Sequence, residues 1–151
     1  MKGTVVFDFD DTLADTVRFK KTLDASRMRE FVFKDADAVL RRLKDEGWEL
    51  ALLTVGDQGW QAWKVAGSGL LPYFDHVLYT AEPKTSRVAA MLAWTPPLVF
   101  VNDNGAEIDA LRGLLPSAKM VAVRGPKALP ASADVPVCSD LEEVYRCIAM
   151  G

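Results

Sequence analysis

Three carboxylates follow directly on an apolar stretch near the start of the chain. Asp8, Asp10 and Asp11 come after Thr4–Phe7, whose β-branched and aromatic residues are typical of a strand buried on both faces. Because successive side chains of a strand point to opposite sides, Asp8 and Asp10 project together and Phe9 points elsewhere. Neighbouring carboxylates repel each other, and a hard divalent cation with oxygen ligands, Mg²⁺ first, is the partner that stabilises them. The stretch therefore predicts an anionic site that binds a cation or holds a phosphate group.

A solvated acidic turn is the alternative for such a sequence, and the polar residues further along the chain distinguish the two. Thr54 ends a second apolar run, Lys84 precedes an expected helix, and Asp103 follows a further apolar run. In an open α/β sheet, ligands bind outside the carboxyl ends of the strands. We therefore expect these three side chains to converge on the first two aspartates.

The apolar runs and the breaks between them predict alternating strands and helices. We expect strands at 4–7, 48–54, 75–80, 98–101 and 119–123, and helices at 35–45, 58–66, 85–94, 107–114 and 140–149, with Gly67 breaking the second of these helices. Alternation of this kind requires crossover connections, a parallel sheet and helices on both faces. The sequence thus predicts an α/β fold: a single three-layer, doubly wound, Rossmann-like domain over residues 1–151 with a five-stranded parallel sheet.

The composition narrows the possible functions. A net charge of −3 and a pI near 5.2 argue against general nucleic-acid binding. No stretch reaches the length of a membrane span, and no secretory signal precedes the first strand, so we expect a cytoplasmic protein without membrane contact. A single histidine excludes most histidine-based metal sites, and the two cysteines lie in no metal-binding motif. The chemistry is therefore expected to rest on carboxylates.

The order of these polar groups resembles the four motifs of the haloacid dehalogenase-like (HAD) superfamily, and the resemblance spans nearly the whole chain. It is carried by Asp8-Phe9-Asp10-Asp11-Thr12-Leu13, then Thr54, Lys84 and Asn102-Asp103-Asn104. The resemblance implies that Asp8 is the nucleophile and Asp10 the general acid and base. It further implies that Thr54 and Lys84 hold the phosphoryl oxygens, and that the metal ligands are Asp8, the backbone carbonyl of Asp10, and Asp103.

These roles together imply a Mg²⁺-dependent phosphomonoesterase that works through an aspartyl-phosphate. Phosphoryl transfer requires in-line positioning and neutralised oxygens, which a dication, an ammonium group and a hydroxyl supply. The chain departs from the family pattern in that Asn102 stands where Gly is frequent and Pro83 precedes Lys84, whereas Lys-Pro is the frequent order. Glu107 stands where a second Asp is common, so Glu107 and Asn104 are candidates for that additional acidic or ligand position.

The gaps between the motifs are too short for the folded cap domain that many HAD proteins insert. We therefore expect an open site with only a short flap-like segment, residues 14–34, beside it. That segment is rich in basic residues: Arg18, Lys20, Lys21, Arg27, Arg29 and Lys34. The expected substrate is a phosphorylated small molecule or a phosphorylated macromolecule, and a homo-oligomer that covers the site is left open.

Three other readings remain open from the sequence. A receiver-like signalling domain also uses acidic residues, Thr and Lys on a five-stranded parallel sheet, but its phosphorylated Asp lies on a later strand. A dehalogenase proper would lack the second aspartate, here Asp10. A non-catalytic module that binds phosphate or a partner is the third alternative.

Overall fold

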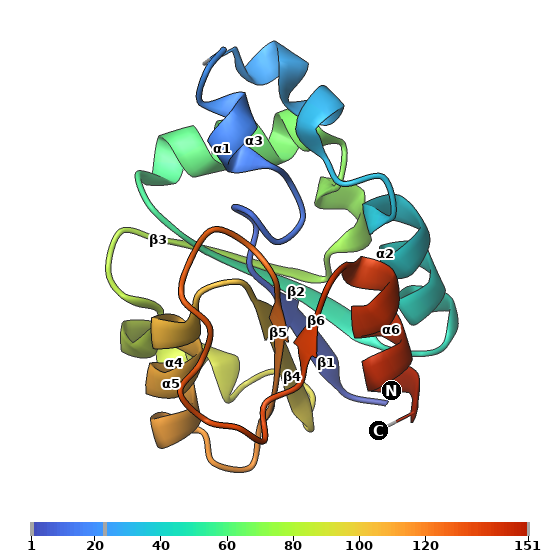
Figure 1. Cartoon of the computed structure of the whole chain (residues 1–151), viewed down its shortest axis with the longest axis vertical. Helices are drawn as coiled ribbons and strands as arrows, with labels where there is room; N and C mark the ends of the chain where they lie inside the picture. The colour runs from blue at the N-terminus through green and yellow to red at the C-terminus, as the bar shows by residue number, and fades with distance from the viewer. Residues whose placement is uncertain (1, 23, 151) are drawn as a thin grey trace.

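The computed structural model of the chain describes residues 2–22 and 24–150. Within them, six parallel strands form one sheet in the order β3-β2-β1-β4-β5-β6, with β1 near its centre (Figure 1). The strands are β1 (Thr4–Phe7), β2 (Glu49–Val55), β3 (His76–Thr80), β4 (Leu98–Asn102), β5 (Lys119–Val123) and β6 (Val137–Cys138). The α-helices are α1 (Thr16–Phe19), α2 (Ala36–Asp45), α3 (Gln58–Ser68), α4 (Val88–Met91), α5 (Gly105–Leu114) and α6 (Leu141–Met150). The 3₁₀ helices are η1 (Ala25–Phe31), η2 (Leu71–Tyr73) and η3 (Lys84–Arg87).

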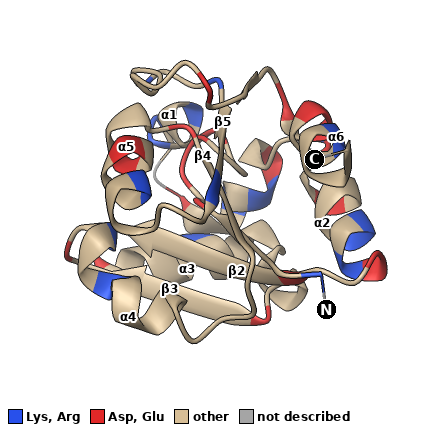
Figure 2. Ribbon diagram, turned by 90° about the horizontal axis from the view of Figure 1, so that it is seen from below, with Lys and Arg blue, Asp and Glu red and all other residues tan. Residues whose placement is uncertain are grey.

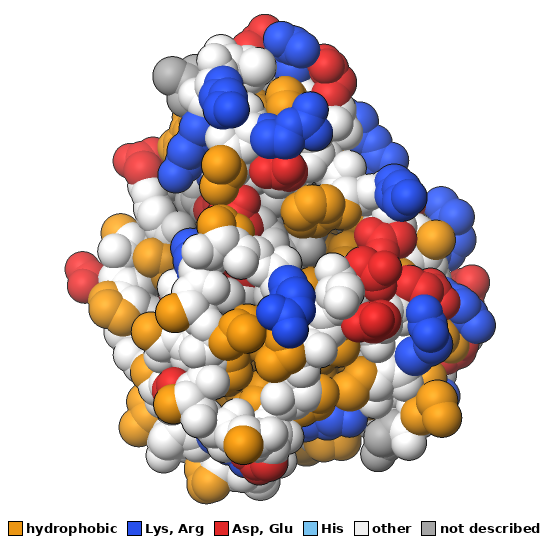
Figure 3. All heavy atoms as spheres, in the orientation of Figure 1, with side chains coloured by type: hydrophobic (Ala, Val, Ile, Leu, Met, Phe, Trp, Pro, Cys, Tyr) orange, Lys and Arg blue, Asp and Glu red, His pale blue; other side chains and the backbone are white. Residues whose placement is uncertain are grey.

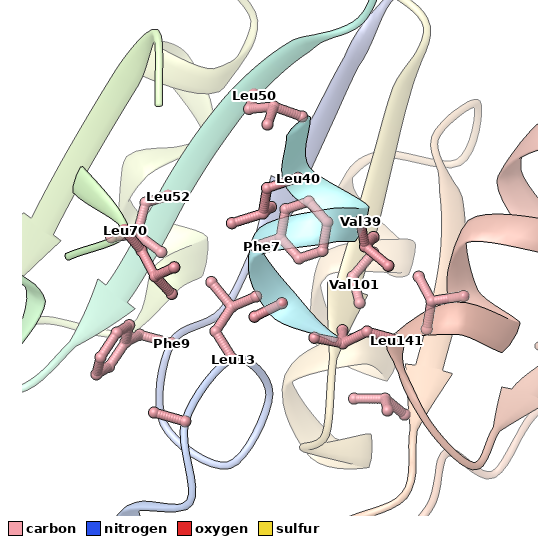
Figure 4. Close-up of a cluster of buried hydrophobic side chains, with 14 of the residues drawn as sticks. Phe7, Phe9, Leu13, Val39, Leu40, Leu50, Leu52, Leu70, Val101 and Leu141 are labelled. Atoms are coloured by element: carbon pink, nitrogen blue, oxygen red, sulfur yellow. The ribbon is translucent and has the colours of Figure 1, made fainter. Parts of the chain in front are cut away.

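Alternate side chains of β1 enter two separate cores, which produces three layers. Val5 and Phe7 belong to the core beneath α2, α3 and α6, whereas Val6 belongs to the core beneath α4 and α5. In Figure 4, Phe7 lies beside Leu40 and Val39 of α2, in the layer of apolar side chains between the sheet and the helices. This burial on both faces is the reason that the strand is apolar throughout. The fold is α/β, doubly wound and Rossmann-like, as predicted.

The strand order locates the crevice where an α/β sheet binds its ligands. The chain passes from β1 through α2 to β2 on one side, and from β4 through α5 to β5 on the other. β1 and β4 are paired neighbours, with Phe7 opposite Val101. Connections that leave neighbouring strands in opposite directions open a crevice at their carboxyl ends. The residues that follow β1 and β4 therefore line this crevice.

The flap-like segment is docked on α3. The rings of Phe19 and Trp60 are 6.0 Å apart, and the guanidinium of Arg29 donates to the carbonyl oxygen of Ser68 at 2.9 Å. α1, η1 and α3 thus form the end of the molecule above the carboxyl edge of the sheet (Figure 1).

Three expectations about the elements are wrong in detail. The sheet has six strands and not five, because β6 has only two residues within a Pro-rich segment and gives no alternating pattern. The helix expected at 85–94 is divided into η3 and the short α4, and the 3₁₀ turn holds Lys84 in the crevice, so a tertiary contact overrides helical propensity. Gly67 does not end its helix: it lies inside α3, where the carbonyl oxygen of Ala25 occupies the place of a Cβ. The helix ends at Gly69, which has a φ of 75°.

No helix in the described ranges has both the length and the apolar character needed to cross a bilayer.

Candidate active site

Asp8 lies immediately beyond β1, in the crevice. Its backbone N–H donates to the carbonyl oxygen of Val101 at 3.0 Å, so the sheet itself holds the residue in place. One carboxylate oxygen accepts from the ammonium of Lys84 at 2.8 Å and the other from the hydroxyl of Thr12 at 3.2 Å. The Asp8 side chain is only 9 % exposed. A nearly buried carboxylate therefore faces the crevice with a cation directly beside it.

Lys84 is shared between two carboxylates. Its ammonium also lies 2.9 Å from the carboxylate of Glu107, which accepts from the amide of Asn102 at 2.8 Å. Burial alone would lower the pKa of Lys84, but the charges of Asp8 and Glu107 raise it, so the ammonium form is retained. The pKa of Glu107 is raised by burial but lowered more by Lys84 and Asn102, and the net direction is downward. Glu107 thus acts here as a partner of Lys84.

Asn104 caps the amino end of α5. It is the N-cap residue of α5, and its side-chain oxygen accepts from the backbone N–H of Glu107 at 3.2 Å. Asn102 supports the same turn by accepting from the backbone N–H of Asn104 at 3.0 Å. Both asparagines therefore shape the loop after β4.

Asp10 is held from two sides by side chains of the flap-like segment and α3. One carboxylate oxygen accepts from Lys64 at 2.6 Å and from the hydroxyl of Thr16 at 2.7 Å, and the other accepts from the amide of Gln61 at 2.9 Å. The Lys64 side chain is only 2 % exposed, whereas that of Asp10 is 23 % exposed. Burial would raise the pKa of Asp10, but the charge of Lys64 and the three hydrogen bonds bring it below the ordinary value. Asp10 is therefore fixed in one orientation with part of its surface still open.

Gln61 connects Asp10 to Thr54. Its amide also donates to the hydroxyl oxygen of Thr54 at 2.6 Å. Thr54 lies at the carboxyl end of β2, as expected, but its side chain is fully buried. The hydroxyl of Thr54 can therefore meet a substrate only from inside the crevice.

Asp11 takes part in the turn rather than in the network around Asp8. Its φ of 60° is the left-handed conformation, which Asp tolerates better than most residues, and its carboxylate accepts from the backbone N–H groups of Thr16 and Val17. The acidic turn thus contains two aspartates that face the site and one that accepts from the first backbone N–H groups of α1.

Asp103 lies beyond β4 with one oxygen unsatisfied. Its Oδ1 accepts from the hydroxyl of Thr12 at 3.4 Å, and its Oδ2 is buried without a hydrogen bond within the described residues. The ammonium of Lys127 lies 3.6 Å from this Oδ2. Burial first, and then the charge of Asp8, raises the pKa of Asp103 to about 7, with Lys127 acting in the opposite direction. A buried oxygen of this kind normally has a hydrogen-bond partner or a ligand, so Oδ2 of Asp103 is the atom of the site that is open to one.

The predicted metal ligands fit a magnesium ion, because one of their buried oxygens, Oδ2 of Asp103, has no hydrogen bond within the described residues. Among the described residues, no three His, Cys, Asp or Glu side chains gather as a metal-binding cluster. The predicted set does not require one, because it consists of the Asp8 and Asp103 carboxylates with the backbone carbonyl of Asp10. Mg²⁺ commonly keeps several water ligands and uses only one or two carboxylates. The unsatisfied Oδ2 of Asp103 is the atom that such an ion would satisfy.

Four residues of the site were missed by the sequence reasoning: Thr16, Gln61, Lys64 and Lys127. Gln61 and Lys64 are three residues apart on the face of α3 that also buries Ser68, so three polar side chains recur on one buried face. That periodicity was an available signal. Lys127 lies between β5 and β6, in a Pro-rich stretch without periodicity, and nothing in the sequence distinguished it.

The basic residues of the flap-like segment gather at one end of the molecule, where Figure 3 shows Lys and Arg side chains with a few acidic ones. Arg27 is paired with Glu30 at 3.0 Å, and Arg29 with Asp37. Lys20 is exposed. Charged positions are otherwise confined mostly to helices and loops, and the central strands carry few (Figure 2).

No family model and no curated protein sequence matches the chain. Solved structures do match. A haloacid dehalogenase-like hydrolase from Burkholderia xenovorans LB400 has a TM-score of 0.80 and 17 % identity, over 99 % of this chain and 98 % of the other. The HAD-hydrolase YfnB from Bacillus subtilis, bound to magnesium, has a TM-score of 0.72 and 14 % identity, over 97 % and 98 %. L-2-haloacid dehalogenase from Xanthobacter autotrophicus has a TM-score of 0.72 and 17 % identity, over 99 % of both chains. The chain therefore has the HAD-like fold, in agreement with the resemblance of its motifs to those of the HAD superfamily.

Proposed function

We propose that this protein is a Mg²⁺-dependent phosphomonoesterase of the HAD type that forms an aspartyl-phosphate on Asp8. The observation that carries the proposal is the setting of Asp8 at the crevice: the ammonium of Lys84 is 2.8 Å from one oxygen, and Asp103 has an unsatisfied oxygen nearby. An anionic nucleophile meets an anionic substrate only where cations neutralise both. The substrate is a phosphorylated small molecule or macromolecule.

In the first step, a carboxylate oxygen of Asp8 attacks phosphorus, and the bond between phosphorus and the leaving oxygen breaks. Lys84 neutralises a phosphoryl oxygen, and Thr54 donates its hydroxyl to another. Asp10 gives a proton to the leaving oxygen, which departs as an alcohol. Lys64, Gln61 and Thr16 hold the Asp10 carboxyl in the orientation needed for that transfer.

In the second step, Asp10 removes a proton from a water molecule that attacks the phosphorus of the aspartyl-phosphate. The bond to Asp8 breaks, inorganic phosphate leaves, and the Asp8 carboxylate is restored. Asp8, Asp103 and the backbone carbonyl of Asp10 would hold Mg²⁺, and the ion would supply charge neutralisation for the phosphoryl oxygens. Because Asp10 alternates between acid and base, it needs both a partner that stabilises its anion and an open side.

Carbon–halogen hydrolysis is the second candidate, because a solved dehalogenase shares the fold. The same nucleophile serves both reactions, but the leaving groups differ. An alkoxide is a strong base that requires a proton, whereas a halide is a weak base that leaves without one. Asp10 can supply that proton, and three side-chain donors fix its orientation, so the presence of an aspartate at this position favours phosphate esters over carbon–halogen bonds.

The test is an assay of phosphosugars, nucleotides, phosphopeptides and phosphate-ended oligonucleotides, with and without Mg²⁺, alongside 2-haloacids. We expect phosphate release that requires Mg²⁺ and that falls below detection in Asp8→Asn, since the amide has nearly the same shape but cannot form the acyl phosphate. A folded Asp8→Asn variant with wild-type turnover would exclude the mechanism. Halide release without phosphate release would favour the second candidate instead.

A further inference from the structure

The loop between β5 and β6 brings a cation against the carboxylates that are proposed to bind Mg²⁺. The ammonium of Lys127 lies 3.6 Å from Oδ2 of Asp103 and 3.9 Å from Oδ2 of Asp11. The first of these oxygens is the buried atom that has no hydrogen bond within the described residues. The Lys127 side chain is 42 % exposed, so it approaches the site from its solvent side. The ammonium of Lys127 therefore lies beside Oδ2 of Asp103, the oxygen that the proposed metal would use.

The backbone of this loop is packed closely against the site, so the position of Lys127 is not that of a free surface side chain. A Cβ at Gly125 would lie 3.0 Å from Oδ2 of Asp103, so the loop passes directly over this carboxylate. The backbone N–H of Gly105, at the start of α5, donates to the carbonyl oxygen of Ala128 at 2.8 Å. A close approach before Lys127 and a hydrogen bond after it thus hold the loop against the residues that follow β4 on both sides of the lysine.

We propose that Lys127 is the built-in counter-ion of the metal-site carboxylates and that Mg²⁺ must displace its ammonium from Asp103 in order to bind. This inference rests on the proposed metal site. Two cations that use the same oxygen compete, so Lys127 weakens Mg²⁺ binding and sets the Mg²⁺ concentration at which the site fills. Once displaced, the ammonium remains at the rim of the crevice, because the loop is anchored on both sides.

The test measures Mg²⁺ binding in the absence of substrate, by isothermal titration calorimetry at low ionic strength. A unit charge less than 4 Å from a ligand oxygen alters the affinity by about tenfold even when solvent screens it strongly, so we expect Lys127→Gln to bind Mg²⁺ about tenfold more tightly. Lys127→Arg retains the cation and should bind like the wild type. Lys2→Gln is the matched control, because Lys2 precedes β1 at the opposite edge of the sheet and is exposed. It makes the same charge change and should leave the affinity unaltered.

The outcomes separate this inference from the proposed function. If the wild type and Lys127→Gln bind Mg²⁺ with affinities within a factor of two, Lys127 does not compete and the inference is overturned, while the metal site stands. Weaker binding by Lys127→Gln overturns it as well. If neither protein binds Mg²⁺, the metal site and this inference both fail. Tighter binding that occurs equally in Lys2→Gln would show a general charge effect and would also overturn the inference.

Discussion

Asp103→Asn should stabilise the metal-free protein, although it removes a proposed metal ligand. The carboxylate is 1 % exposed, and one of its oxygens has no hydrogen bond within the described residues. A buried charge without adequate partners is destabilising, whereas a neutral amide of the same shape carries no such penalty. The new amide group can also donate to the neighbouring carboxylate of Asp8. We therefore expect the free energy of unfolding to increase at neutral pH.

The size and pH dependence of this effect follow from linkage. The pKa of Asp103 is raised from 3.8 to about 7 in the folded protein, so the folded state holds a proton that the unfolded state has lost. Below about pH 4 the carboxyl is protonated in both states, and its contribution to stability is fully present. As the pH rises from about 4 to about 7, that contribution is lost, to an extent on the order of 2 to 4 kcal/mol. The Asp103→Asn variant lacks the titrating group, so its stability does not fall in this way as the pH rises.

The assay is urea denaturation of both proteins in EDTA, at several pH values from 4.5 to 8. The difference in the free energy of unfolding, variant minus wild type, should be smallest at the acidic end and should reach about 2 to 4 kcal/mol at the alkaline end. Saturating Mg²⁺ should reduce this difference, because the ion stabilises the wild type by binding its folded state. A difference that does not depend on pH would refute the reasoning, as would an Asn variant less stable than the wild type at pH 8.

Two further predictions concern the other lysines. Lys64→Met should lower the free energy of unfolding by about 1 to 3 kcal/mol at pH 7, because it leaves the partly buried Asp10 without its cation. Urea denaturation should show that this loss becomes smaller as the pH falls below the range in which Asp ordinarily titrates. A loss that stays constant with pH would contradict the prediction. Exchanging Lys20 and Lys21 for Ser should lower kcat/KM for anionic substrates and weaken its dependence on salt concentration, with little change in kcat. The reason is that exposed charges act mainly on the rate at which substrate and protein meet. An unaltered salt dependence would show that the two lysines are only solvated.

The sequence located site residues best where a residue lies at the end of a strand, because the sheet then fixes its position. Asp8, Thr54 and Asp103 each lie at the end of a buried strand, and local apolar runs are enough to locate such ends. The same reasoning could not determine how far a side chain reaches. Thr54 lies at the predicted strand end, but its hydroxyl oxygen accepts from Gln61, which comes from a different element and which the sequence did not indicate. The rotation of α3 about its axis decides that contact, and this rotation depends on packing against distant residues.

The flap-like segment shows a second limit. Its basic residues were grouped by sequence, yet they differ in their contacts: Arg27 and Arg29 are paired with acidic residues, and Arg18 lies over the ring of Phe31. Charge composition therefore overstated the free positive charge of this segment. Its docking on α3 depends on contacts such as that between Phe19 and Trp60, which are far apart in sequence. The proposal that residues 14–34 act as a flap consequently applies to a packed unit that includes α3.

The charge balance of the crevice supports a divalent ion over a monovalent one. Five carboxylates lie in or beside it, and three ammonium groups contact them: the carboxylates are Asp8, Asp10, Asp11, Asp103 and Glu107, and the ammonium groups are those of Lys64, Lys84 and Lys127. With all of them ionised, two negative charges remain, before any phosphate adds its own. Lys64 and Lys84 are buried and already paired with Asp10 and Asp8, so these carboxylates offset part of their charge before a phosphate arrives. A dication at Asp103 would add positive charge beside the incoming phosphate, at the one buried side-chain oxygen that has no hydrogen bond within the described residues.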